Sequence, residues 1–277
     1  MKKTKATTPI RPFLKWAGNK YRLIERIVAA LPESKRLVEP FVGSGALFLN
    51  SDYKRYLLCD ANPDLITLYQ LLKEQGDDFI AACRPLFCEE NNRAEAYYAL
   101  RDEFNASDDP LRRSVLFVYL NRYGYNGLCR YNSKGGFNVP FGRYKRPYFP
   151  AEEMLAFHHK ARYALFRHQD FATTLAKAKA GDVIYCDPPY VPLSDSANFT
   201  AYSAGGFTME QQQQLVTLAR AAAMRGIPVL ISNHDTRHIR KIYHDATVSR
   251  FQVQRSISCD GKHRGSAGEV LALFSAK

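Results

Sequence analysis

Residues 182–190 read Asp182-Val183-Ile184-Tyr185-Cys186-Asp187-Pro188-Pro189-Tyr190. The first five form an apolar, strand-like run, and the last four place an acid, two rigid prolines and an aromatic ring at its carboxyl end. The carboxylate of Asp187 and a main-chain carbonyl held by the prolines can accept both hydrogens of an amino group, while the ring of Tyr190 offers a stacking face. The segment therefore predicts a clamp for a flat molecule that carries an amine, the requirement for alkylating a nucleobase amine.

A second strand-to-turn element strengthens this interpretation, because a strand ending in a proline-rich turn is common by itself. Leu37-Val38 leads into Glu39-Pro40-Phe41-Val42-Gly43-Ser44-Gly45, and residues 46–50 then look helical. Glycines at 43 and 45 let such a turn approach a ligand closely. The spacing lacks the third glycine of a dinucleotide fingerprint, so a nicotinamide cofactor is not favoured. The strand candidate 55–59 ends in Asp60, an acid placed to hold the two hydroxyls of an adenosine ribose.

The wider chain has the pattern of an α/β sheet. Short apolar strand candidates at 37–38, 55–59, 182–186 and 227–232 are separated by longer helical segments. The helix before the last of these is expected to be capped by Thr208 and stopped by Gly226. Residues 248–257 and 269–274 predict two further strands joined by the polar loop 258–268.

Between Asp60 and about Pro150 the pattern changes to helices at 63–75, 77–87, 91–105 and 110–122, which predicts an inserted helical module. From Leu111 to Pro147 there is no Asp or Glu. The same stretch contains Arg112, Arg113, Arg122, Arg130, Lys134, Arg143, Lys145 and Arg146. Basic groups interleaved with Tyr and Asn, around a hairpin candidate at Gly135-Gly136, favour a surface that holds phosphates and reads base edges. The alternative is a solvated basic loop with core tyrosines.

Composition points to the same class of partner. The 277 residues include 39 Lys+Arg and 27 Asp+Glu, a formal charge of +12 that favours a polyanion, nucleic acid above an anionic membrane. No apolar run approaches a bilayer-spanning length, so we expect a cytoplasmic protein. The six cysteines show neither zinc nor disulfide spacing, and the histidines show no metal-ligand spacing, so we predict no metal.

These motifs, in this order, resemble the DNA adenine-N6 methyltransferases of the Dam type. The resemblance runs from residues 13–20, Phe13-Leu14-Lys15-Trp16-Ala17-Gly18-Asn19-Lys20, through the turn at 41–45, the segment 120–132 and the clamp at 187–190, to Ile231-Ser232-Asn233-His234-Asp235. It implies a Rossmann-like methyltransferase sheet formed by residues 1–62 and 151–277. Residues 63–150 would then form a mainly helical DNA-recognition domain with a β-hairpin.

The resemblance also implies roles for individual residues. S-adenosylmethionine, which leaves as S-adenosylhomocysteine, would be bound by Trp16, Lys20, Glu39, Phe41, Gly43, Gly45, Asp60 and Asp187. Catalysis would use Asp187, Pro188, Pro189 and Tyr190, with Tyr190 stacking on a flipped adenine. DNA would be contacted by Lys15, Tyr125, Asn126, Leu128, Arg130, Pro140, Arg143 and Tyr144. Tyr125 would wedge into the duplex, Asn126 would engage the orphaned base, and Leu128 and Arg130 would read the second half of the site.

The family's usual target is the adenine of GATC, and we expect double-stranded DNA as the partner of a bacterial or phage, nucleoid-associated monomer. The chain departs from the family pattern at Asn19, where a second glycine is common, and in the weakly basic loop 259–268. Two alternatives remain from other classes. A protein-glutamine methyltransferase would have no use for the acid-free insert and would more typically carry Asn at the position of Asp187. A catalytically silent DNA-binding protein would not need the intact clamp and glycine turn.

Overall fold

The computed structural model describes residues 9–190, 207–254 and 266–276. The chain divides into two compact units. The helical unit comprises Met1–Val28, Gly43–Asp52 and Pro63–Ala164, and the sheet unit comprises Ala29–Val42, Tyr53–Asn62 and Leu165–Lys277. Compactness alone does not define a DNA-recognition domain, so the partition at 62/63 and 150/151 stays a prediction.

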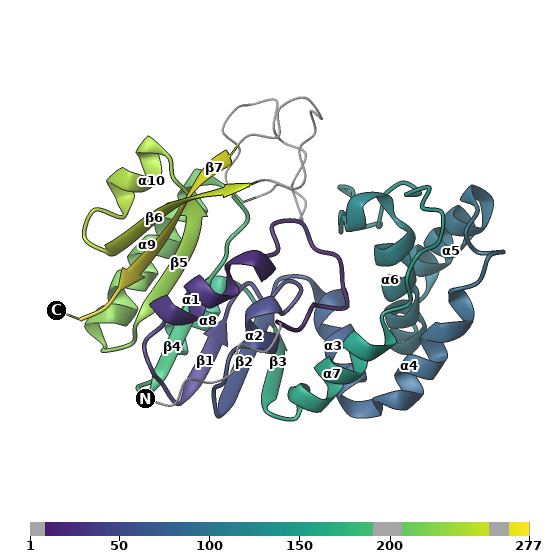
Figure 1. Ribbon diagram of the computed structural model, residues 1–277, viewed down its shortest axis with the longest axis horizontal. Coiled ribbons are helices and arrows are strands. Elements are labelled where there is room, and N and C mark those ends of the chain that lie inside the picture. The colour runs from purple at the N-terminus through teal and green to yellow at the C-terminus, as the bar shows by residue number, and fades with distance from the viewer. Residues whose placement is uncertain (1–8, 191–206, 255–265, 277) are drawn as a thin grey trace. The chain divides into compact units, whose positions relative to one another are not determined.

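A seven-stranded sheet organises the sheet unit, in the order β3-β2-β1-β4-β5-β7-β6 (Figure 1). Its strands are β1 (Arg36–Glu39), β2 (Arg55–Asp60), β3 (Ala164–His168), β4 (Asp182–Cys186), β5 (Val229–His234), β6 (Thr247–Gln254) and β7 (Ser266–Phe274). The central strands β2, β1, β4 and β5 run parallel, whereas β7 is antiparallel to both β5 and β6. The chain is therefore an α/β protein with a mixed sheet, as the alternating pattern predicts.

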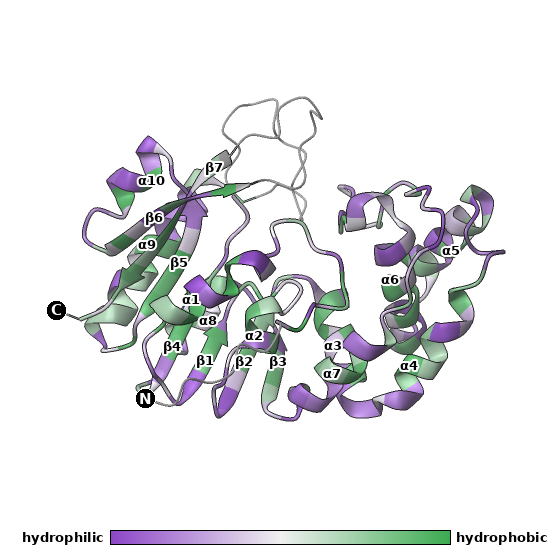
Figure 2. Ribbon diagram, viewed as in Figure 1, coloured by the Kyte–Doolittle hydropathy of each residue, from purple (hydrophilic) through white to green (hydrophobic). Residues whose placement is uncertain are grey.

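Burial explains why the central strands read as continuous apolar runs. All five residues of β4 are buried, because parallel strands are covered on both faces. One face packs against three helices, α8 (Phe171–Ala176), α9 (Met209–Met224) and α10 (Arg237–Ile242), in a single apolar cluster. Figure 2 shows the hydrophobic colouring along β4 and β5. The cluster includes Cys59, Cys186 and Ile231, so helix packing supports the sheet up to the carboxyl ends of β2, β4 and β5.

Local signals fix where these three helices begin. Asp170 caps α8 by accepting from the Thr173 N–H at 2.7 Å, and Thr236 caps α10 by accepting from the Ile239 N–H at 3.1 Å. The predicted cap of α9 is confirmed, since Thr208 and Gln211 form a reciprocal capping box. Gly226, with φ +75°, follows the end of α9 in the left-handed conformation that suits glycine.

The helical unit is built from the predicted helices. They are α3 (Pro63–Gln75), α4 (Asp77–Cys83), α5 (Ala94–Ala106) and α6 (Pro110–Tyr123), joined by α2 (Ala46–Asn50) and α7 (Ala151–Ala161). Short turns of 3-10 helix lie at η1 (Tyr21–Leu23), η2 (Arg84–Leu86) and η3 (Tyr125–Gly127), and α1 (Ile24–Ala30) follows η1. Helix α6 is buried along most of its length from Ser114 to Tyr123, so it is the core of this unit.

The predicted elements and the observed ones differ in a few places. The predicted strands at 37–38, 55–59, 182–186 and 227–232 correspond to β1, β2, β4 and β5, while β3 was not predicted. β3 is short, and only Ala164 and Phe166 of it are buried, which leaves a weak apolar signal. β7 begins at Ser266, inside the predicted loop 258–268, and residues 259–265 of the weakly basic loop lie outside the described residues.

Candidate functional site

Three acids meet the carboxyl edge of the central parallel strands. Glu39 ends β1, Asp60 ends β2, and Asp187 directly follows β4. β1 lies between β2 and β4 in the sheet, so the direction of strand addition reverses between β1 and β4. In open α/β sheets, ligands bind at the carboxyl side of such a switch point. The sequence-predicted acids Glu39 and Asp187 therefore flank the position where the fold places a site.

The carboxylate of Asp187 is oriented by neighbours on β4 and β5. The Ser232 hydroxyl donates to Asp187 Oδ1 at 2.8 Å, and the Tyr185 hydroxyl donates to Ser232 Oγ at 3.1 Å. Burial, reinforced by the charge of Asp187, raises the pKa of Tyr185 well above its usual value, so the phenol keeps its proton and remains a donor. The chain of two hydrogen bonds holds the plane of the carboxylate at the edge of the sheet.

The aromatic ring of the clamp is also held from behind. The Tyr190 hydroxyl donates to Glu269 Oε2 at 2.8 Å, and its ring lies edge-on to the His234 imidazole with 4.0 Å between centroids. Burial and the charges of Asp187 and Glu269 raise the pKa of Tyr190 well above its usual value. Pro188 is buried and Pro189 half-buried between these two oriented groups. The four residues 187–190 thus form a preorganised segment.

A buried polar cluster stiffens the end of β5 on which this arrangement depends. Asn233 donates to Gln212 Oε1 at 2.9 Å and to the Tyr243 hydroxyl at 3.2 Å, and Gln212 donates to the same hydroxyl at 3.0 Å. All three side chains are buried, so their bonds tie β5 to α9 and to the end of α10. Ser232, one residue earlier on β5, is fixed by this tie.

The predicted cofactor acids and ring in the sheet unit occupy distinct positions. Glu39 is buried, with 3 % of its surface exposed, and Asp60 is half-buried with its Oδ1 accepting from the Asn62 N–H at 3.0 Å. Phe41 stacks on Phe171 with 5.5 Å between centroids and meets Phe207 edge-on at 5.8 Å. The edge therefore offers two carboxylates near a fixed aromatic wall.

In the helical unit, the glycine turn lies directly against an indole. A Cβ at Gly43 would lie 2.8 Å from Trp16 Nε1, and the φ of Gly43 is +46°, so this position requires glycine. The Tyr69 hydroxyl donates to the Gly43 carbonyl at 2.6 Å and fixes the turn. Gly45, with φ +70°, is the residue from which α2 begins. The structure thus brings together three of the predicted cofactor residues, Trp16, Gly43 and Gly45.

The segment around Lys20 explains the departure at Asn19. The Asn19 side chain accepts from the Tyr21 N–H at 2.7 Å, which fixes the backbone that leads into the turn η1. Lys20 is buried and its Nζ donates to the Gly18 carbonyl at 2.8 Å. Asparagine at 19 therefore stabilises the backbone next to Lys20 rather than disrupting it.

The sharp turn after α6 presents the predicted wedge. Tyr125 is 51 % exposed, and its N–H donates to the Pro140 carbonyl at 2.8 Å. Asn126 is also exposed and has φ +53°, a conformation that asparagine tolerates. Gly127 packs on Lys15 so closely that a Cβ would lie 2.1 Å from Lys15 Cβ. Tyr125 and Asn126 therefore project from a turn that is anchored at both ends.

Lys15 is the most constrained of the predicted DNA contacts. Its main chain exchanges hydrogen bonds with the Asn121 side chain, at 2.8 Å from its N–H and 2.7 Å to its carbonyl. Its Nζ lies 3.8 Å from the centroid of the Tyr144 ring and donates to the Arg122 carbonyl at 3.2 Å. Burial, with the charge of Arg122, lowers the pKa of Lys15 to about 8. Lys15 is therefore a cation whose charge is easily lost.

Arg130 is held in place by the opposite side of a tight turn. Its Nε donates to Asn138 Oδ1 at 2.8 Å and its Nη2 to the Asn138 carbonyl at 3.2 Å. The predicted hairpin at Gly135-Gly136 is this turn, closed by a single bridge between Tyr131 and Phe137. Leu128 is half-buried beside Arg130, whereas Pro140 and Arg143 are exposed on the returning segment.

Fewer cations of the basic insert, residues 111–147, face outward than its sequence indicates. Arg113 pairs with Asp64 at 2.8 Å, and Arg112 makes a two-bond pair with Glu103, so nearby helices supply the acids that residues 111–147 lack. Arg122 donates to the carbonyls of Tyr148 and Phe13, and Tyr123 is buried in the core. These four residues are structural, and the outward-facing cations of the stretch are fewer than eight.

Neither a metal site nor a membrane span is found among the residues that the structure describes. No three His, Cys, Asp or Glu side chains there come close enough to hold a metal ion. No helix in the described ranges is both long and apolar enough to cross a bilayer.

Sequence reasoning missed the groups that orient the clamp: Ser232, Tyr185, His234 and Glu269. Ser232 and His234 stand at the carboxyl end of β5, next to β4 in the sheet, and this position was their available signal. Glu269 lies on the antiparallel strand β7 opposite His234, a pairing that no local pattern announces.

Comparisons with known proteins agree on the family. Residues 16–257 match the family described as D12 class N6 adenine-specific DNA methyltransferase. A DNA adenine methylase of Escherichia coli (strain K12) is 54 % identical over 264 residues, 95 % of each chain. A DNA adenine methylase of Vibrio cholerae is 53 % identical over 96 % of each chain, and one of Serratia marcescens is 51 % identical over 95 % of this chain and 98 % of its own. Among solved structures, an rRNA methyltransferase from Streptomyces viridochromogenes has a TM-score of 0.41 at 13 % identity, covering 98 % of this chain and 91 % of its own, which adds no support.

The match covers most of the chain and includes the glycine turn, the insert and the oriented Asp187-Pro188-Pro189-Tyr190 segment. The chain belongs to the D12 class of N6 adenine-specific DNA methyltransferases.

Proposed function

We propose that this protein transfers a methyl group from S-adenosylmethionine to the N6 amine of the adenine in GATC, after flipping that base out of duplex DNA. The observation that carries the proposal is the Asp187 carboxylate, fixed by the Ser232 hydroxyl at 2.8 Å beside the switch point of the sheet. Because its proposed substrate is DNA and its relatives are bacterial, we also propose that the protein works in the bacterial cytoplasm, on the nucleoid, and acts as a monomer.

The clamp suits an amine that is a poor nucleophile, since the N6 lone pair is delocalised into the adenine ring. In our proposal, Asp187 and the Pro188 carbonyl accept the two amine hydrogens and turn the lone pair out of the ring plane. Preorganised acceptors of this kind do not have to reorganise when charge develops. Tyr190 supports the base by stacking, and the ties of its hydroxyl to Glu269 and of its ring to His234 keep that face in place.

The residues at hand fit S-adenosylmethionine, which supplies an electrophilic methyl group on a sulfonium. The turn leaves no room for a Cβ at Gly43 beside Trp16, as expected where backbone and indole together face a ligand. Glu39 and Asp60 are acids suited to an ammonium group and to ribose hydroxyls, and Phe41 and Trp16 are rings suited to a flat base or a cation. Lys20 would help to hold the carboxylate of the cofactor.

Plasmid digestion tests the target sequence. The protein is expressed in a host that lacks adenine methylation, and its plasmid is cut with one endonuclease blocked by methylation of GATC and with another that is indifferent to it. We expect protection only from the first. Incorporation of labelled methyl groups into a plasmid that the first endonuclease still cuts would show a different target.

The cofactor assignment predicts that Trp16→Ala and Asp60→Ala weaken S-adenosylmethionine binding more than DNA binding. Each removes a group assigned to the cofactor, and an uncompensated polar or stacking contact contributes roughly 1 kcal/mol or more, about fivefold in affinity. Calorimetric titration with the cofactor alone measures this. Unchanged cofactor affinity in both variants would show that Trp16 and Asp60 do not belong to the cofactor site.

The depressed pKa of Lys15 predicts DNA binding that weakens at alkaline pH. Contact with DNA, an anion, would raise the pKa of Lys15 above its value of about 8 in the free protein, so binding takes up a proton and affinity falls as pH rises from 7 to 9. Uptake of one proton can lower the DNA affinity by at most tenfold per pH unit. Fluorescence anisotropy on a GATC duplex should show this slope in the wild type and a flatter one in Lys15→Met. Equal slopes in the two proteins would show that Lys15 does not contact the DNA.

The wedge assignment predicts that Tyr125→Ala impairs base flipping more than DNA affinity. Affinity rests mainly on phosphates, whereas stacking of one base on an aromatic ring contributes roughly 1–3 kcal/mol. With 2-aminopurine at the target adenine, the wild type should raise the fluorescence at saturating protein, and the variant should give a several-fold smaller or slower rise. Tyr163→Ala, which removes another exposed tyrosine, is the control. A wild-type signal from Tyr125→Ala would make this residue a mere surface contact.

A further inference from the structure

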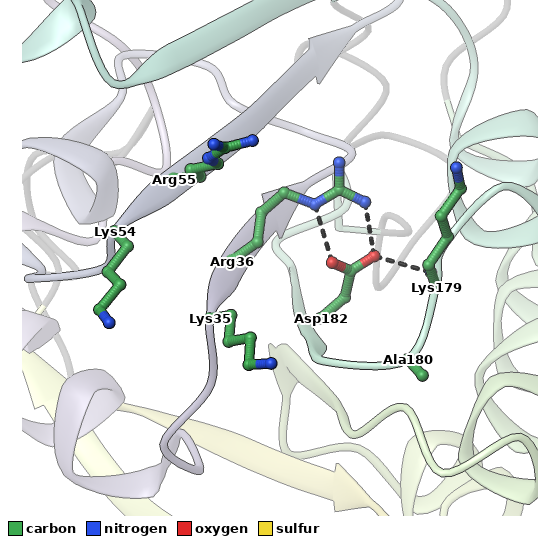
Figure 3. Close-up of a pocket in the computed structure, with 7 residues that line it drawn as sticks. All are labelled: Lys35, Arg36, Lys54, Arg55, Lys179, Ala180 and Asp182. Atoms are coloured by element: carbon green, nitrogen blue, oxygen red, sulfur yellow. Dashed lines mark hydrogen bonds and ion pairs between the residues drawn. The ribbon is translucent and has the colours of Figure 1, made fainter.

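A basic pocket lies at the opposite edge of the sheet from the clamp. It has a volume of about 380 Å³ and is lined by Lys35, Arg36, Lys54, Arg55, Lys179, Ala180 and Asp182 (Figure 3). Arg36, Arg55 and Asp182 are the first residues of β1, β2 and β4, so the pocket lies at the amino edge of these parallel strands. β4 has five residues, and at roughly 3.3 Å per residue the two edges are about 16 Å apart.

The single carboxylate of the pocket is already engaged. Asp182 accepts from Arg36 through both oxygens, at 2.8 and 2.7 Å, and also accepts from the Lys179 N–H at 2.7 Å. Asp182 is buried at 4 % exposure, and its two-bond pairing with Arg36 offsets the cost of that burial. It therefore cannot also neutralise the remaining cations.

Four cations remain around this pair. Lys35, Lys54, Arg55 and Lys179 are exposed, and none of their side chains makes a hydrogen bond or ion pair with another described residue. Arg55 is the cross-strand partner of Arg36, but Arg36 is already paired with Asp182, so Arg55 places a second guanidinium without a described carboxylate partner on the neighbouring strand. The pocket thus carries four positive charges that no carboxylate of the described residues pairs with.

The frame of the pocket is rigid although its side-chain tips are exposed. The Gly181 carbonyl accepts from the Lys35 N–H at 3.1 Å, from the Arg36 N–H at 3.3 Å and from the Ser34 hydroxyl at 2.7 Å. Gly181 has φ +89°, which favours glycine. These bonds hold the segment before β1 against the segment before β4, so the backbone at this edge of the sheet is fixed, and the cations follow the edge as a row.

The row favours an extended polyanion. Arg55 begins β2 and Lys54 precedes it, Lys35 directly precedes β1, and Lys179 lies in the segment before β4. Neighbouring strands are about 4.8 Å apart, so the row across β2, β1 and β4 spans roughly 10 Å. Each strand of duplex DNA carries one phosphate per about 3.4 Å of helix axis, so a row of this length can contact more than one phosphate. A single phosphate ion would instead call for cations that converge on one point.

We propose that this amino-edge pocket binds the phosphate backbone of a second duplex segment while the first is held for methylation. The enzyme then passes between segments without leaving DNA. The proposal goes beyond the methyl transfer itself, and it assigns no sequence preference to the pocket, since it involves only phosphates.

The test compares two doubly substituted proteins of equal net charge. Lys54→Ser with Arg55→Ser removes two unpaired cations of the pocket and keeps the Arg36–Asp182 pair. Arg162→Ser with Arg167→Ser removes two exposed arginines next to and on β3 and is the control. Turnover on a short duplex with one GATC site should stay within about twofold of the wild type for both, because neither pair touches the clamp. Thermal melting verifies that both are folded.

Release of a labelled duplex is then followed at increasing concentrations of unlabelled competitor duplex. In the wild type and the control, release should accelerate with competitor, because a second segment binds before the first leaves. In the pocket variant, release should become independent of competitor. On long DNA, the slope of log affinity against log salt should fall by about 2, close to 0.9 for each lost phosphate contact.

Three outcomes would overturn the proposal. One is wild-type competitor dependence in the pocket variant, and another is equal loss in the control, which would make net charge the cause. The third is calorimetric binding of inorganic phosphate or pyrophosphate that the pocket variant loses while its transfer between duplexes is unchanged, which would assign the pocket to a small anion. Plasmid protection is measured separately, so a failure of this proposal is distinguishable from a failure of the proposed function.

Discussion

Asp187→Ala should abolish methyl transfer while the protein stays folded. The substitution removes a fixed acceptor that is needed as the amine becomes tetrahedral, and losing one such preorganised group typically slows an enzyme by about 100-fold or more. The fold should tolerate the change, because Asp187 is only half-buried and Ser232, which donates to it, has the Cys186 carbonyl 3.4 Å away as a second acceptor. Single-turnover incorporation of labelled methyl groups into a GATC duplex measures the chemical step directly.

Two companion variants separate chemistry from charge and from orientation. Asp52→Ala removes an exposed acid outside the site and should leave the rate unchanged. Ser232→Ala keeps the Asp187 carboxylate but frees its orientation, so we expect a loss of about tenfold in the methyl-transfer rate with cofactor affinity retained, close to the lower limit of the roughly 1.5–3 kcal/mol of a hydrogen bond to a charged group. Ser232→Thr, which restores the hydroxyl, should recover most of the rate. Near-normal turnover by folded Asp187→Ala would exclude the clamp.

The positions of the central parallel strands along the chain could be predicted because these strands are buried on both faces and leave continuous apolar runs. β4 and β5 are of this kind, and both were predicted. β3 was missed because an edge strand of five residues with two buried side chains resembles a loop. The hydrophobic pattern therefore identified the centre of the sheet but missed the edge formed by β3.

Only part of the candidate site could likewise be predicted from the sequence. Asp187 and Tyr190 were found because their signal is contiguous in sequence, whereas Ser232 and Glu269 reach them from 45 and 79 residues away. The insert shows the opposite error. Arg112 and Arg113 lie in a stretch without acids, yet each is paired with a carboxylate from an earlier helix. Where charged residues of packed helices pair with one another, the sequence of one segment overstates the number of unpaired charges on its surface.

Arg130→Ala should relax discrimination at one base pair in the second half of GATC. A guanidinium that reads a base edge contributes about 1–3 kcal/mol against the wrong base, roughly 5- to 150-fold in specificity. Arg130 is suited to this, because its bonds to Asn138 at 2.8 and 3.2 Å fix the guanidinium before DNA arrives. The measurement is the methylation rate on GATC and on the duplexes that differ from it by one base pair.

Two variants calibrate the Arg130 result. Arg130→Lys keeps the charge but loses the planar fork, so its discrimination should fall nearly as far as that of Arg130→Ala. Arg112→Ala removes a basic group that pairs with Glu103, and it should change the rates on all duplexes equally or not at all. The preference ratio between GATC and the variant duplex thus isolates base reading from phosphate contact. If Arg130→Ala lowers the rate on every duplex by the same factor, Arg130 contacts the backbone, and base reading at that position belongs to another residue of the turn.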